Sequence, residues 1–113
     1  MKPKIVALRS AAPEHLSAEA RDWWHRITTE YSLDDDAGRL LLQTALEAFD
    51  RMRECQRQIQ QDGLCIRGST RQQRSHPLLQ VERDSRSQML QALKSLNLDL
   101  EPLRDRPGRP VGA

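Results

Sequence analysis

The sequence predicts an all-α fold: a helical hairpin with one long central helix, a third helix and a short hairpin-like connection, assembling as an oligomer. Three observations support this prediction. An amphipathic pattern runs without proline from Asp34 to Asp62. Hydrophobic residues make up only 37% of the 113 residues, which favours a narrow core between helices. Strand-like residues are confined to Leu64, Cys65 and Ile66.

The central helix is expected from Asp34 to Asp62. Its apolar residues recur at steps of three and four and therefore share one face: Leu41, Ala45, Ala48, Met52, Cys55 and Ile59, with Leu42, Leu46 and Phe49 widening the stripe. Aspartates suit its positive amino end, and Gly63 can take the left-handed conformation that closes a helix. About 29 residues give a helix of about 43 Å. A compact domain of this size is about 35 Å across, so we expect the helix to project beyond its own subunit.

Shorter helices are expected on either side. The first runs from Ser17, a good N-cap, to Tyr31. Its apolar stripe consists of Leu16, Ala20, Trp23, Ile27 and Tyr31. Trp24 falls off the centre of that stripe, and we interpret it as a core residue, with a subunit interface as the alternative. A very short turn at Ser32 and Leu33 makes the first and central helices neighbours.

The third helix is expected to begin at Pro77, capped by His76 or Ser75, and to end before Asn97, which tolerates the left-handed conformation. Its inward stripe is Leu78, Ser85, Met89, Leu93 and Leu96, flanked by Leu79, Val81 and Leu90. Its outward face carries Glu82, Arg83, Arg86 and Lys94. Before this helix, a turn at Gly68 and Ser69 would fold the strand-like residues back as a small, marginal hairpin or an ordered loop.

The chain is expected to form one domain. We divide it into a flexible basic arm at residues 1–12, a helical domain at 13–103 and a flexible tail at 104–113. No apolar run is long enough for a membrane span or a signal peptide, so a soluble intracellular protein is expected. Cys55 and Cys65 do not form a ligand-like cluster and are interpreted as reduced structural cysteines.

No catalytic, cofactor or metal site is expected. Gly63 to Thr70 has the glycine spacing of a phosphate loop, but Ser69 stands in place of the lysine and the segment follows a helix instead of a strand. The three histidines lack the spacing of a helical metal pair, and no nucleophile motif occurs. These features favour a helical binding or assembly protein over an enzyme.

Taken in order, four segments resemble the small terminase subunits of tailed bacteriophages and prophages. They are PEHLSAEARDWWHRITTEY, DDDAGRLLLQTALEAFDRM, HPLLQVERDSRSQMLQALKSLNLDLEPLR and the GRP of the tail, with Gly63 and an arginine-bearing connection between the second and the third. The resemblance spans about Pro13 to Arg109. Two departures are His76, where asparagine is expected, and Asn97, where glycine is expected.

The resemblance implies a non-catalytic phage DNA-packaging protein in the cytoplasm of the bacterial host. Such a protein oligomerises as a ring, binds double-stranded viral DNA at the packaging start site and delivers it to the large terminase subunit, the ATPase and nuclease. The residues alone leave two alternatives: a dimeric helical DNA-binding transcription regulator and, more weakly, a small helical enzyme.

Phosphate contacts require cations on a surface without competing acids. The net charge is only +2, but residues 63–77 carry Arg67, Arg71 and Arg74 and no acid, which makes these arginines the first DNA-binding candidates. Second candidates lie in the arm and the tail: Lys2, Lys4, Arg9, Arg104, Arg106 and Arg109. Those ends could instead meet the large subunit. A helix-turn-helix is disfavoured because its recognition helix would begin with three aspartates.

Overall fold

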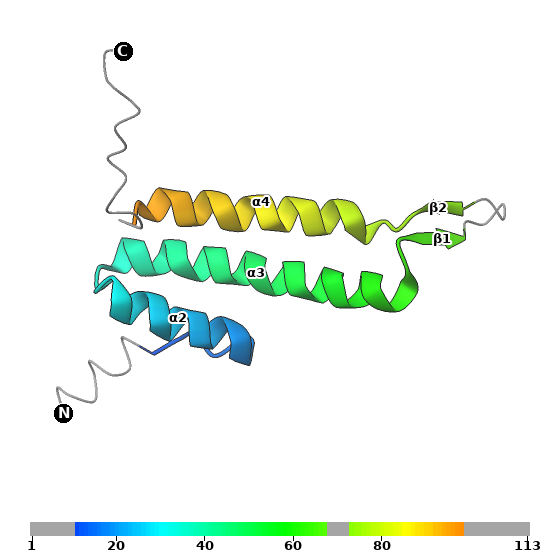
Figure 1. Cartoon of the computed structure of the whole chain (residues 1–113). Helices are drawn as coiled ribbons and strands as arrows, with labels where there is room; N and C mark the ends of the chain where they lie inside the picture. The colour runs from blue at the N-terminus through cyan, green and yellow to red at the C-terminus, as the bar shows by residue number, and fades with distance from the viewer. Residues whose placement is uncertain (1–10, 68–72, 99–113) are drawn as a thin grey trace, which may run out of the picture.

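The computed structural model describes residues 11–67 and 73–98 of the chain. Its elements in order are α2 (Ala18–Glu30), α3 (Asp36–Asp62), β1 (Cys65–Arg67), β2 (Gln73–Ser75) and α4 (Leu78–Leu96). Figure 1 shows α3 between the other two helices, with the hairpin at one end. The predicted helical fold with a short hairpin is confirmed, while assembly as an oligomer stays a prediction. The predicted arm and tail lie largely outside the described residues, as do Gly68 and Ser69.

α3 and α4 form an antiparallel helical hairpin. The buried face of α3 is the predicted stripe, and its larger members are Leu42, Leu46, Phe49, Met52, Cys55 and Ile59. Leu41 is only half-buried. In Figure 1, α4 runs back along most of the length of α3. The long helix, which we expected to project beyond its own subunit, is therefore covered along most of its length by α4 of the same chain.

α2 packs on the amino-terminal half of α3, and of its two adjacent tryptophans only Trp24 is buried. Trp24 is 3% exposed and belongs to the core with Leu16 and Ala20, whereas Trp23 is 40% exposed. The core interpretation of Trp24 is confirmed, and the placement of Trp23 on the inward stripe is wrong. Ala20 and Trp24 are four residues apart and so share one face of the helix, whereas the adjacent Trp23 points about 100° away from Trp24.

The start of α2 is fastened to α3. Ser17 caps the helix because its Oγ accepts a hydrogen bond from the Ala20 backbone N–H at 3.0 Å. Asp50 on α3 accepts two hydrogen bonds from the same residue, from the Ser17 N–H at 2.9 Å and from its Oγ at 2.6 Å. Ser17 therefore caps α2 and also binds Asp50, and this second contact fixes where α2 begins against α3.

The end of α3 is closed by Gly63, but not in the expected conformation. Its φ of 89° is positive as predicted, whereas its ψ of 163° lies far from the left-handed helical region. This conformation is essentially restricted to glycine. Because ψ is extended, the chain passes directly from the helix into β1. Asn97, after α4, has the left-handed values predicted for it, with φ 52° and ψ 47°.

His76 connects the end of α3 to the start of α4. It is buried, and its Nε2 lies 2.8 Å from Oδ2 of Asp62. Its Nδ1 accepts a hydrogen bond from the Leu78 backbone N–H at 3.1 Å, which confirms the predicted cap. The helix begins at Leu78, one residue later than expected, and Pro77 directly precedes it with helical φ and ψ.

One expected position in α4 is wrong. Glu82 was placed on the outward face, but it is only 8% exposed. It accepts a hydrogen bond from Nε2 of Gln56 on α3 at 2.9 Å, and it forms an ion pair with Arg86. These partners compensate for the burial of its charge and hold the pKa of the carboxyl below its usual value, the hydrogen bond from Gln56 being the larger cause.

Candidate nucleic-acid interface

The β1–β2 hairpin extends from the end of the α3–α4 pair (Figure 1). The strands are antiparallel, with Cys65 opposite Ser75, Ile66 opposite Arg74 and Arg67 opposite Gln73. The His76 N–H donates to the Leu64 carbonyl at 2.8 Å and continues the pairing towards the helices. Since His76 is also bonded to Asp62, the base of the hairpin is tied to α3.

Two of the three arginines predicted for the DNA site are described, and both are exposed. Arg67 and Arg74 occupy neighbouring positions of the ladder, because Arg74 pairs with Ile66. Successive residues of a strand point to opposite faces, so Arg67 and Arg74 lie on opposite faces of the hairpin. The structure therefore brings them to one element but not to one face.

The other predicted site residues lie outside the described residues. Arg71 falls between the two strands, in residues 68–72. The candidates of the arm and the tail are also outside: Lys2, Lys4, Arg9, Arg104, Arg106 and Arg109. Their roles remain predictions.

Acidic side chains gather at the opposite end of α3. Glu30, Asp34 and Asp36 are exposed around the turn between α2 and α3, and the Asp35 carboxylate caps α3 by accepting from the Gly38 N–H at 2.8 Å. The 27 residues of α3 separate this turn from the hairpin by about 40 Å. The described part of the chain therefore has an acidic and a basic end. Repulsion of phosphate disfavours the acidic end as a DNA-contacting surface.

A second basic surface lies on the outer side of α4. Arg83, Arg86 and Lys94 are exposed there beside Leu90, which is itself 55% exposed. The sequence placed the three basic residues outward but did not identify them as a nucleic-acid surface. Arg86 is already paired with Glu82, so Arg83 and Lys94 supply most of the available charge. This surface is therefore a second candidate for DNA binding, beside the hairpin.

The described residues offer little for catalysis. No group of three or more histidine, cysteine or acidic side chains among them is arranged to hold a metal ion. Cys55 and Cys65 are free thiols, and burial raises the pKa of the Cys55 thiol, which lowers its reactivity. None of the helices in this part of the chain is long and apolar enough to cross a membrane.

Comparison with known proteins gives one family. The model of the phage terminase small subunit matches residues 20–102, which is most of the chain. No curated protein and no solved structure gives a significant match. The matched range contains α2 from Ala20 onward, together with α3, the hairpin and α4. The chain therefore belongs to the phage terminase small-subunit family, whose members are non-catalytic proteins of viral DNA packaging.

Proposed function

We propose that this small subunit assembles into a homo-oligomeric ring and binds double-stranded viral DNA through its basic hairpin, at the packaging start site. The ring then delivers the DNA to the large terminase subunit, the ATPase and nuclease. The observation that carries the proposal is the position of Arg67 and Arg74, exposed on opposite faces of one hairpin at the end farthest from the acidic turn.

The hairpin has a suitable shape for DNA. The major groove is about 12 Å wide and admits a two-stranded β-ribbon. A hairpin that enters by its tip turns one face towards each phosphate strand, so Arg67 and Arg74 would each neutralise phosphates on one wall. Arg71, between the strands in the sequence, would add a third positive charge near the tip.

Assembly multiplies this charge. Three arginines per subunit are a weak site on a monomer, but a ring repeats them as a belt whose potential attracts DNA. The acidic turn about 40 Å away would keep the opposite rim of the ring free of DNA. That rim, together with the arm and the tail, is then available to the large subunit.

The experiment replaces the three arginines together, Arg67→Ala, Arg71→Ala and Arg74→Ala, and measures DNA affinity across salt concentrations. Each lost phosphate contact lowers the slope of log K against log salt by about 0.9, so the slope should fall by about 2.7 per engaged hairpin. The matched control is Arg83→Ala with Lys94→Ala, which removes positive charge from the outer side of α4.

Light scattering must show that both variants keep the mass of the unmodified assembly. Weak DNA binding by the hairpin variant and unchanged binding by the α4 variant would support the proposal. If the α4 variant alone loses affinity, the DNA-binding surface is the rival one and the hairpin proposal is wrong.

A further inference from the structure

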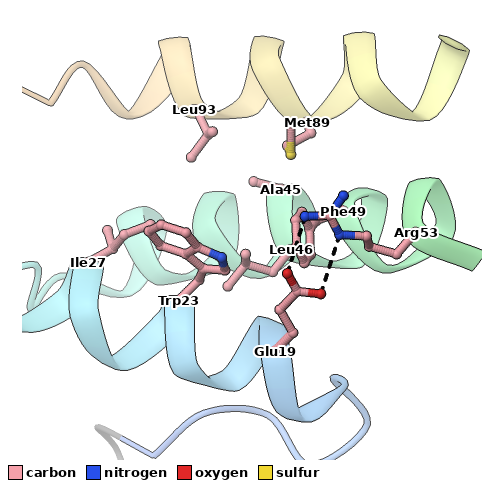
Figure 2. A pocket seen from close by; sticks show the side chains of 9 residues that line it. All are labelled: Glu19, Trp23, Ile27, Ala45, Leu46, Phe49, Arg53, Met89 and Leu93. Carbon is pink, nitrogen blue, oxygen red and sulfur yellow. Dashed lines mark hydrogen bonds and ion pairs between the residues drawn. The ribbon is translucent and has the colours of Figure 1, made fainter. Parts of the chain in front are cut away.

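An apolar groove runs between α2 and α4, with α3 as its floor. Figure 2 shows Trp23 and Ile27 of α2 on one side of this space and Met89 and Leu93 of α4 on the other, with Phe49 of α3 between them in this view. Its volume is about 310 Å³. An apolar cavity of about 150 Å³ accommodates a benzene-sized group, so this groove has room for about two large apolar side chains.

The groove leaves apolar surface uncovered. Trp23 is 40% exposed, and Met89 and Leu93 are only half-buried although they pack against the core. Burying apolar area is favourable by about 25 cal/mol per Å². A segment that fills the groove would therefore be stabilised by all three side chains.

The described part of the chain ends beside this groove. Leu93, on its wall, lies one helical turn before Asn97, which ends α4 in the left-handed conformation. A left-handed residue at this position ends the helix, so the chain does not continue along the axis of α4. The following residues, Leu98, Asp99, Leu100, Glu101 and Pro102, alternate between apolar and acidic up to the proline. In an extended conformation, Leu98, Leu100 and Pro102 share one face.

We propose that the segment after α4, residues 98–103, folds back and docks in the α2–α4 groove of its own chain. The proposal is independent of DNA binding. The segment lies at the carboxyl end of the range that matches the family model, which reaches residue 102.

The reach is sufficient. Met89 lies eight residues before Asn97, or about 12 Å along α4. An extended chain advances about 3.3 Å per residue, so Leu100, three residues after Asn97, reaches about 10 Å back. That position falls between Leu93 and Met89, at the middle of the groove. The short tether gives the segment a high effective concentration that a neighbouring chain does not have.

The rim of the groove carries paired charges. The Arg26 guanidinium stacks on Trp23 at 5.1 Å, and the Arg53 guanidinium stacks on Phe49 at 4.9 Å. Each is ion-paired with a neighbouring carboxylate, Arg26 with Asp22 at 3.1 Å and Arg53 with Glu19 at 3.2 Å. The docked segment would turn Asp99 and Glu101 towards solvent, so its binding rests on its apolar side chains.

The first experiment uses Trp23 as the reporter, because Trp24 is buried whether or not the groove is filled. The substitution Leu100→Asp should shift the tryptophan emission to longer wavelength and increase its quenching by iodide. Val111→Ser, in the same tail but beyond the docking segment, is the matched control and should change neither. Circular dichroism must show unchanged helix content. Equal quenching in Leu100→Asp and the unmodified chain would overturn the proposal.

A second experiment identifies the occupant. Met89→Cys with Leu100→Cys, in a Cys65→Ser background, should form a disulfide within one chain on mild oxidation, because a disulfide requires Cα atoms about 4.4–6.8 Å apart. Ser87→Cys with Leu100→Cys is the control, since Ser87 lies on the outer side of α4. Cross-links between chains would overturn docking in the same chain and assign the groove to a second copy. Absence of cross-linking would overturn the proposal altogether.

Discussion

Replacement of Gly63 tests how the end of α3 directs the hairpin. The residue has φ 89° and ψ 163°, and a Cβ added there would meet only the Cys65 carbonyl oxygen at 3.9 Å, an ordinary contact. Space is therefore not limiting for Gly63→Ala. The cost arises from the backbone conformation, which side chains disfavour by about 1–3 kcal/mol. We expect the free energy of unfolding to fall by that amount.

Two further substitutions, Gly63→Asn and Asn97→Gly, distinguish the conformation of Gly63 from an ordinary left-handed helix cap. Asparagine is tolerated in the left-handed region but not at the ψ of Gly63. Gly63→Asn should therefore cost nearly as much as Gly63→Ala. Asn97→Gly, at a true left-handed position, should change stability by less than about 1 kcal/mol. Equal and small effects at the two sites would refute the conformation described for Gly63.

The assay is urea unfolding followed by circular dichroism, with all variants at one protein concentration because assembly contributes to stability. DNA binding gives a second readout. Gly63→Ala removes no charge, so it should weaken binding by misdirecting the hairpin while leaving net charge and assembly mass unchanged. If Gly63→Ala loses the full stability but keeps its DNA affinity, the direction of the hairpin does not matter for DNA binding.

Three further predictions concern the helices. Trp24→Ala should lower the free energy of unfolding by about 3–5 kcal/mol, and Trp23→Ala by much less; similar losses would contradict their different burial. Asp50→Ala should cost about 1–2 kcal/mol by removing both bonds to Ser17, and faster hydrogen exchange confined to α2 would show it. The pKa of Glu82 is lowered on folding, so its contribution is complete above the unfolded pKa of about 4.3 and is lost as pH falls through the folded value. Glu82→Gln should remove that acid-sensitive part of stability, and an unchanged pH profile would contradict the assignment.

Helix boundaries were predictable because their signals are local. Ser17, Gly63 and Asn97 lie within one residue of the helix ends that they mark, and α2, α3 and α4 begin or end within two residues of the expected positions. A cap depends on the conformation of one residue and on a few neighbouring backbone groups. Such information is present in any short window of sequence.

The incorrect predictions concern which side chains of a helix point towards the core. Adjacent tryptophans offer two possible stripes on α2, and the choice between Trp23 and Trp24 is made by the surface of α3. Carboxylates are rarely buried without a partner, so a sequence pattern alone places Glu82 outward. That partner is Gln56, on another helix, and sequence spacing alone does not reveal the pair.

The candidate DNA surface was predictable in part. Charge along the sequence identified the arginines of the hairpin, and the hairpin itself was expected. The opposite faces of Arg67 and Arg74 follow from strand register, which pairs Arg67 with Gln73 and leaves residues 68–72 as the connection. A tight turn at Gly68 and Ser69 would have given a different register. The composition of residues 63–77 does not determine how many residues connect the two strands.

The family assigns a packaging role, and the ring is the part of our account that most needs a direct test. The measurement is the solution mass of the purified full chain by light scattering, across a wide range of protein concentration. We predict one species of many subunits whose mass does not change on dilution through the working range. A monomer or dimer at every concentration would contradict the ring and, with it, the belt of hairpins proposed to bind DNA.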